Sequence, residues 1–341
     1  MQPRYAIIDA DAHVVERGSE TYRPYLPEAY RQRTGSFFPS PAWDVRMNGT
    51  LGKLDPSEPQ VYLQDMDAEN IRTQVLFPSN ALSIGFVREL DWAPVLAAAY
   101  NDWLRDFCQH APDRLKGVAV IAPQNPSAAV AEMERAVSKL GMVAVMMPTY
   151  ISPGLDTGHE QFWPIYAQAE RLGVPLAFHA TAQAAVGNTR FHSYIGVHMT
   201  SHPFEQMISI ISMIAGGVLD RFPRLQVAFL EAGVGWVPYW MDRFDEKWEK
   251  RTAETPRSEL LPSEYVKAGR CYFTCEGEES ALPLFLERFG NRCVMYASDY
   301  PHWDTGWPNT AREILERADL TPDTKARIMS LNAREFYHLS E

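Results

Sequence analysis

Cysteine is scarce in this chain and follows no recognisable pattern. Its 341 residues include only four cysteines, and none of them forms a Cys-x-x-Cys pair. That spacing is typical of zinc-binding and redox motifs, so a cysteine-based metal centre is not predicted. Three of the four lie within or at the start of strand-like segments, where cysteine behaves as a small hydrophobic residue. We therefore expect reduced thiols in the core at Cys108, Cys271, Cys275 and Cys293.

Basic charge and long apolar runs are also lacking. The formal net charge is -11, and no basic patch is visible. Nucleic acids and anionic membrane surfaces bind basic faces, so neither is predicted as a partner. The longest apolar runs, such as residues 142–148, are far too short to span a bilayer. The N-terminus leads directly into a strand-like run without a leader pattern, and we expect a cytoplasmic protein.

Strand-like segments recur along the chain with helix-like stretches between them. Hydrophobic residues make up 46% of the chain and charged residues 22%, as in ordinary globular proteins. In residues 126–140, for example, Val130, Met133 and Val137 lie at helical spacing. Eight such units predict an α/β fold, a closed (β/α)8 TIM barrel that forms one domain over residues 1–341. The predicted strands are 5–8, 73–77, 117–121, 143–147, 174–178, 226–230, 271–274 and 293–297.

Side chains that can bind a metal ion follow some of these strands and not others. The carboxyl ends of all strands of a TIM barrel surround one mouth, where the chemistry takes place. The second, third and fourth segments end in Pro78, Pro123 and Pro148. The others are followed by Asp11 and His13, by His179, by Glu231, by Glu276, and by Asp299 with His302. An Asp-x-His pair is also common in turns, but the convergence of these side chains on one mouth favours a metal site.

Two connections are longer than a minimal loop between a strand and a helix. Residues 14–59 are rich in proline, arginine and tyrosine, and we expect a lid over the mouth or a subunit contact. Within this insertion Arg46 and Asn48 are candidate substrate contacts, although an exposed loop arginine is more often merely solvated. A second insertion, residues 182–201, follows the fifth strand, leads to His202 and is expected to form another wall of the mouth.

Short motifs from end to end of the chain resemble those of one enzyme family. They include Asp9-x-Asp11-x-His13, Phe178-His179, His202-Pro-Phe-Glu205, Glu231-Ala-Gly233 and Ser298-Asp299-Tyr-Pro-His302. With these motifs the chain resembles the amidohydrolase superfamily, in the branch related to aminocarboxymuconate-semialdehyde decarboxylase. The resemblance implies one divalent metal ion held by Asp11, His13, His179 and Asp299, and it favours a homodimer.

The chain departs from the pattern of this family at two positions. Asp11 stands where many relatives have histidine; zinc is the first expectation for the metal, but a carboxylate ligand also suits manganese or iron. Glu231 stands where many relatives have a catalytic histidine on the sixth strand. Three roles remain open for it: a base that takes a proton from water, a fifth metal ligand, or a partner of His202.

These residues predict a metal-dependent hydrolase that acts on a small aromatic or unsaturated carbonyl or carboxylate compound. Glu231 or Asp299 would activate water, and His302 or His202 would stabilise the oxyanion or protonate the leaving group. Glu276 would contact the substrate or pair with a basic neighbour. The alternative is non-oxidative decarboxylation of an aromatic or enol carboxylic acid, with a protonated Glu231 as the acid. A third possibility is a non-catalytic binding barrel.

Overall fold

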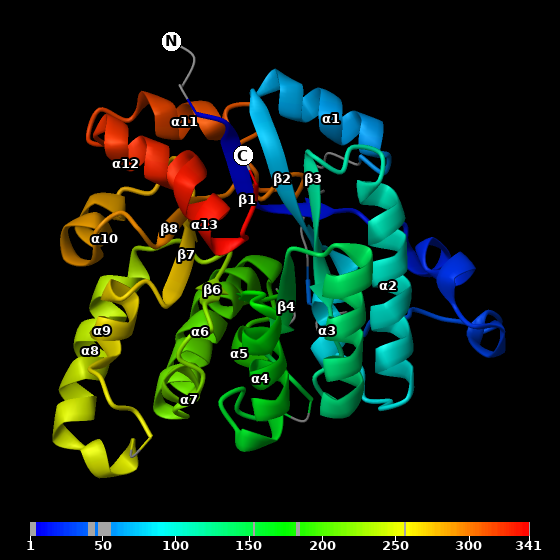
Figure 1. Cartoon of the computed structure of the whole chain (residues 1–341), viewed down its shortest axis with the longest axis horizontal. Coiled ribbons are helices and arrows are strands. Elements are labelled where there is room, and N and C mark those ends of the chain that lie inside the picture. Colours follow the sequence, from blue (N-terminus) through cyan, green and yellow to red (C-terminus); the bar gives the residue numbers. More distant parts are fainter. Residues whose placement is uncertain are drawn as a thin grey trace.

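The computed structural model describes residues 5–39, 45–46, 56–152, 154–181, 185–255 and 257–340. Eight parallel strands follow one another around a barrel in chain order, and helices surround them (Figure 1). The TIM barrel prediction is thereby confirmed. The strands are β1 (Ile7–Val14), β2 (Ile71–Pro78), β3 (Leu115–Val120), β4 (Ala144–Pro148), β5 (Leu176–His179), β6 (Val227–Phe229), β7 (Cys271–Cys275) and β8 (Val294–Tyr296).

The helices lie outside the barrel, as Figure 1 shows for α2, α3 and α8. The longer ones are α1 (Pro59–Ala68), α2 (Trp92–Cys108), α3 (Pro126–Leu140), α4 (Trp163–Leu172), α6 (Tyr194–Ala215), α8 (Trp236–Lys250) and α10 (Leu282–Phe289). Shorter ones are α5 (Ala185–Asn188), α7 (Val218–Arg221), α9 (Pro262–Lys267), α11 (Thr310–Glu316), α12 (Pro322–Ala326) and α13 (Asn332–Phe336). The 3-10 turns are η1 (Gly18–Thr21), η2 (Arg23–Tyr25), η3 (Glu28–Tyr30), η4 (Asn80–Phe86), η5 (Glu160–Phe162) and η6 (Thr252–Glu254), and η7 (Arg327–Leu331) is a π-helix.

Helix α3 illustrates how local sequence sets the bounds of an element. The side chain of Asn125 accepts a hydrogen bond from the amide of Ala128, which caps the amino end, and Pro126 occupies the first helical position. At the other end Gly141 adopts a left-handed conformation, with φ of 74°. Both signals are local, and the helix therefore spans the residues that the periodicity predicts.

Strand β1 is longer than predicted. It continues past Ile8 to Val14, and all its residues are buried. The sequence pattern suggested an earlier end because Asp9 is charged, yet its carboxylate has partners inside the protein. It accepts hydrogen bonds from the Ser298 amide (3.0 Å), the Ser298 hydroxyl (2.5 Å) and the Gln74 side chain (3.1 Å). Asp11 and His13 consequently belong to the strand itself and are held by its backbone.

The barrel closes between β1 and the end of β8. The amide of His13 donates to the Tyr300 carbonyl (2.7 Å), and the amide of Asp299 donates to the Asp11 carbonyl (3.1 Å). The Asp9–Ser298 hydrogen bonds lie at the same seam. The segment that contains Asp299 is therefore fixed to the strand that contains Asp11 and His13.

In the described residues, backbone hydrogen bonds join the two insertions. Arg46 forms a bridge with Ser193, in which the Arg46 amide donates to His192 and the Tyr194 amide donates to Arg46. The second insertion is only partly a loop, because α6 begins at Tyr194 and includes its last residues. That the first insertion acts as a lid or a subunit contact, and that the second forms another wall of the mouth, stay predictions.

The prediction of buried core thiols agrees with the fold, because the four cysteines are buried and form no disulfide. In the described part of the chain, none of the helices combines the length and the apolar character that crossing a membrane requires.

The buried side chain of Gln206 on α6 ties together the ends of β5 and β6. Its amide group donates to the carbonyls of Phe178 (2.9 Å) and Leu230 (2.7 Å). We predict that Gln206→Leu lowers the free energy of unfolding by roughly 2–3 kcal/mol, because two buried carbonyls lose their donor. Urea denaturation would measure this loss, with Gln161→Leu at an exposed position as the control. Equal stability of the two variants would contradict the prediction.

Candidate metal centre and active site

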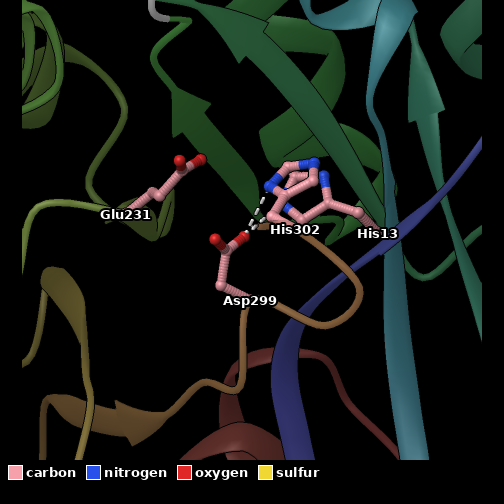
Figure 2. A group of neighbouring side chains, drawn as sticks. All are labelled: His13, Glu231, Asp299 and His302. Carbon is pink, nitrogen blue, oxygen red and sulfur yellow. Dashed lines mark ion pairs between the residues drawn. The ribbon is translucent and has the colours of Figure 1, made fainter. Parts of the chain in front are cut away.

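Four buried side chains and that of the half-buried Glu231, from β1, β5 and the segments after β6 and β8, converge at the mouth of the barrel. The Nε2 atom of His13 lies 3.6 Å from Asp11 Oδ1 and 3.3 Å from Asp299 Oδ1. The Nε2 atom of His179 lies 3.6 Å from Asp11 Oδ1 and 3.1 Å from Glu231 Oε2. Figure 2 shows Asp299 facing the imidazole of His13, with Glu231 directed into the same space. The four predicted ligands thus meet, and Glu231 joins them.

Four buried atoms of the cluster, Asp11 Oδ1, His13 Nε2, His179 Nε2 and Glu231 Oε2, have no hydrogen-bond partner outside it, and the fifth, Asp299 Oδ1, lies 2.8 Å from Nδ1 of His302. Buried polar atoms without partners are rare, and each one costs free energy. Two imidazole nitrogens and three carboxylate oxygens around one point form a donor set for a divalent cation. The residues therefore fit one divalent metal ion.

The two histidine ligands are oriented by backbone carbonyls. His13 Nδ1 lies 2.8 Å from the Pro78 carbonyl oxygen, and His179 Nδ1 lies 2.7 Å from that of Ala180. A carbonyl only accepts, so each Nδ1 must carry the proton and donate it. Each Nε2 then presents its lone pair to the centre, as a metal ligand requires.

The two carboxylates that follow β6 and β8 have an unusual backbone conformation. Both Glu231 and Asp299 have φ of 52°, in the left-handed region that non-glycine residues rarely adopt. Such conformations cost free energy and persist where the surrounding structure imposes them. Here the amide of Asp299 is bonded to Asp11 and that of Glu231 to the Thr274 hydroxyl (3.2 Å). The strained turns direct both carboxylates into the mouth.

The charges of the cluster explain the pKa shifts of its histidines. Burial alone would lower the pKa of His179, but the carboxylates of Asp11 and Glu231 outweigh it and raise the pKa to about 9. The same competition, with Asp299 as the partner, raises the pKa of His302 to about 10. Without a cation, the carboxylates thus draw protons onto the imidazoles. A divalent cation supplies the same compensation and displaces the protons.

His302 lies directly behind Asp299. Its Nδ1 atom is 2.8 Å from Asp299 Oδ1, and its ring stacks on that of His13 with the centroids 3.9 Å apart (Figure 2). Its Nε2 atom is 3.0 Å from the Ser79 hydroxyl. The imidazole of His302 thus fixes the orientation of the Asp299 carboxylate.

His202 reaches the site from α6 and not from a strand. Its Nε2 atom lies 3.1 Å from Glu231 Oε1, while the other carboxylate oxygen of Glu231 faces His179. Burial would lower the pKa of His202, but Glu231 raises it above its ordinary value. Of the three roles left open for Glu231, the geometry is compatible with a metal ligand and with a partner of His202. Its carboxylate lies between two imidazoles.

The three predicted substrate contacts are placed less clearly. The Arg46 side chain is exposed, although its backbone lies beside Ser193. Asn48 lies outside the described residues. Glu276 follows β7 and is half-buried; burial, with a smaller contribution from the negative charge of Asp299, raises its pKa to about 8. Their contact with a substrate stays a prediction.

Several further residues lie at the mouth that the sequence did not assign to the site. The rings of His198 and His202 lie 4.6 Å apart, and His198 Nε2 lies 3.7 Å from Asp304 Oδ2. The ring of Trp303 packs 5.4 Å from that of His198. The spacing of four residues between His198 and His202 is a signal for one helical face. Nothing in the sequence pointed to Ser79, because it follows Pro78, and Pro78 indicated only where the strand ends.

Comparisons with known proteins agree with this site. A family model described as amidohydrolase matches residues 8–339. A gamma-resorcylate decarboxylase of Rhodococcus jostii (strain RHA1) is 26% identical over 92% of this chain and 96% of its own length. Among solved structures, 5-carboxyvanillate decarboxylase of Sphingomonas paucimobilis matches with a TM-score of 0.80 at 22% identity, over 98% of this chain and 99% of that one. A dihydroxybenzoic acid decarboxylase of Polaromonas sp. JS666, with bound manganese and 2-nitroresorcinol, matches with a TM-score of 0.76 at 22% identity, over 98% and 97%.

These relatives contradict the expectation of hydrolysis. They are decarboxylases, and they favour the alternative that the sequence analysis ranked second. The physical reason for the error lies on β6. The absence of a histidine there counted against decarboxylation, but His202 from α6 brings an imidazole to the same carboxylate. A metal site of this kind also does not by itself decide which bond of a bound substrate breaks.

We predict that the purified protein binds about one equivalent of a divalent metal and that His179→Ala loses most of it, because one of two nitrogen donors is removed. Elemental analysis after gel filtration would measure the metal content. His159→Ala, at an exposed position outside the site, is the matched control. Full metal content in folded His179→Ala would exclude His179 as a ligand.

Proposed function

This chain belongs to the amidohydrolase family of enzymes, and on that premise we propose that it is a metal-dependent decarboxylase of an aromatic or enol carboxylic acid. The observation that carries the proposal is the His202–Glu231 pair at the edge of the converging donor atoms. It places a group that can hold a proton next to the site where a substrate carboxylate would bind. The complete donor set also argues against a non-catalytic barrel.

The metal would be held by Asp11, His13, His179 and Asp299, with Glu231 at its edge. When bound, a divalent cation supplies positive charge that holds an anionic group of the substrate and stabilises charge that develops during the reaction. Zinc was the first expectation from sequence. We propose manganese instead, because oxygen donors outnumber nitrogen donors in the cluster and a structural relative contains it.

Decarboxylation needs an acid and no attacking water. The bond between the ring carbon and the carboxylate breaks, its electron pair stays on the carbon, and carbon dioxide leaves. One proton must then reach that carbon. His202 would hold this proton at Nε2, 3.1 Å from Glu231 Oε1, and Glu231 would orient the imidazole and balance its charge. Solvent would restore the proton after each turnover.

A small hydroxybenzoate is the substrate class that these features favour. The relatives are named for gamma-resorcylate, 5-carboxyvanillate and dihydroxybenzoic acid, which are all aromatic acids. In this chain the rings of Tyr194, His198 and Trp303 pack against one another at the mouth, beside His202. Their faces offer an apolar wall against which an aromatic ring can stack.

A homodimer, the assembly expected from sequence, is part of the same proposal. Several large apolar side chains on α6 are exposed, and together with Trp240 of α8 some of them line a groove of about 450 Å³. An apolar patch of this kind is typical of a subunit interface. Of the exposed apolar residues on α6, Phe204 and Ile208 line this groove, whereas Ile195 and Met199 do not.

If this face joins two copies, Ile208→Glu shifts the protein toward the monomer, because the interface would have to bury an unpaired charge. Light scattering coupled to gel filtration would measure the mass. The control is Leu284→Glu, which introduces the same charge at an exposed leucine on α10. A dimer of unchanged stability in Ile208→Glu would place the interface elsewhere, and a monomeric wild type would refute the homodimer.

The reaction itself can be tested with a panel of hydroxybenzoates and activated esters. We predict chelation-sensitive carbon dioxide release from a hydroxybenzoate. We also predict that Glu231→Gln keeps the metal but lowers kcat by roughly 100-fold or more, because the proton donor loses its charged partner. Hydrolysis of esters without carbon dioxide release would refute the proposed function. Full turnover in Glu231→Gln would remove Glu231 from the mechanism.

A further inference from the structure

The carboxylate of Glu16, two residues after β1, lies buried against the turn that follows β2. It accepts hydrogen bonds from three consecutive amides, those of Ser79 (3.1 Å), Asn80 (2.8 Å) and Ala81 (3.2 Å). The hydroxyl of Tyr22 donates a fourth, at 2.8 Å. The Asn80 side chain also donates to the Glu16 carbonyl, at 2.9 Å. A buried carboxylate with four donors is firmly held, so the turn at Ser79–Ala81 has one defined position.

This turn contacts the active site through the hydroxyl group of Ser79. The Ser79 hydroxyl lies 3.0 Å from Nε2 of His302, and Nδ1 of His302 lies 2.8 Å from Asp299 Oδ1. The ring of His302 also stacks on that of His13. The imidazole is therefore fixed at both nitrogens and on one face. Contacts run without a gap from Glu16 through Ser79 and His302 to a carboxylate of the donor cluster.

We infer that Glu16 and Ser79 are positioning residues of the metal centre. Glu16 fixes the turn after β2, the turn places the Ser79 hydroxyl, and this hydroxyl sets the plane of the His302 ring. His302 in turn holds Asp299 Oδ1 at the place where it faces His13. Loss of the Ser79 hydroxyl removes one of the three contacts that fix the His302 ring and leaves Asp299 less well oriented for a cation.

The alternative is that Glu16 only stabilises the fold. Its own hydrogen bonds are explained equally well by that role, because they join two connections of the barrel. The two roles make different predictions for Ser79. If Glu16 only stabilises the fold, the Ser79 amide that binds Glu16 is needed and the Ser79 hydroxyl is not. If Glu16 positions the metal centre, the Ser79 hydroxyl is needed as well.

The test measures binding of Mn²⁺ alone by calorimetry, together with the thermal unfolding midpoint. We expect Ser79→Ala to weaken Mn²⁺ binding roughly 10-fold, as the loss of an outer partner of a metal site commonly does, with little change in the unfolding midpoint. Ser79→Thr retains a hydroxyl and should restore binding. Ser83→Ala is the matched control, since Ser83 is a buried serine four residues along the same segment. Wild-type Mn²⁺ affinity in Ser79→Ala would overturn the inference.

A second variant tests Glu16 itself. In Glu16→Gln the side-chain NH₂ group would face backbone amides that also donate, so the turn should shift and Mn²⁺ binding should weaken by more than in Ser79→Ala. If this variant does not fold, the result at Ser79 still decides. Folded Glu16→Gln with wild-type Mn²⁺ affinity would show that Glu16 acts on the fold alone.

The kinetic part of the inference rests on the proposed decarboxylase function. With a hydroxybenzoate that the wild type turns over, Ser79→Ala should lower kcat at saturating Mn²⁺ more than it raises KM, because a misoriented Asp299 affects the reaction after binding. If no such substrate is found, the proposed function fails, while Mn²⁺ binding still decides the role of Ser79.

Discussion

The structure depends on the balance of charge at the barrel mouth. Carboxylates of Asp11, Glu231 and Asp299 meet there with little access to water, and one oxygen each of Asp11 and Glu231 has no hydrogen-bond partner outside the cluster. An uncompensated buried charge costs on the order of several kcal/mol. Protons on His179 and His302 offset part of this cost, which is why the pKa of each is raised to about 9 and about 10. A divalent cation offsets it more completely and gives all five donors a partner.

The candidate metal ligands are concentrated where the barrel closes. Asp11 and His13 belong to β1, and Asp299 follows β8, so the seam between the first and last strands contains three of the five donors. Asp9 and Ser298 form hydrogen bonds across the same seam. A ligand set formed by contacts between the two ends of the chain exists only in the folded barrel. Metal binding at this cluster would therefore be coupled to folding, and a bound ion would stabilise the closed seam.

The sequence predicted those features that depend on neighbours in the chain. The strand and helix periodicity, the cap of α3 and the ligand pair Asp11–His13 are of this kind. The predicted end of β1 was wrong, because the partners of Asp9 lie at Gln74 and Ser298. The contact of His202 with Glu231 joins α6 to the end of β6, and that of Ser79 with His302 joins the ends of β2 and β8. No local pattern reports such contacts: the pairing of Glu231 with His202 was one of three roles left open, and Ser79 was missed.

The exchange of a strand histidine for a glutamate plus a helix histidine explains why the reaction type was misread. A lone carboxylate beside a metal ion is a base, and a base suits hydrolysis, in which water must lose a proton. A carboxylate that faces an imidazole at 3.1 Å is different, because it stabilises the protonated imidazole. The pair can then hold a proton for a carbon that has lost carbon dioxide, which a decarboxylase requires. With His202 beside it, Glu231 is suited to stabilise a protonated imidazole, and the proposed decarboxylation rests on the pair and not on either residue alone.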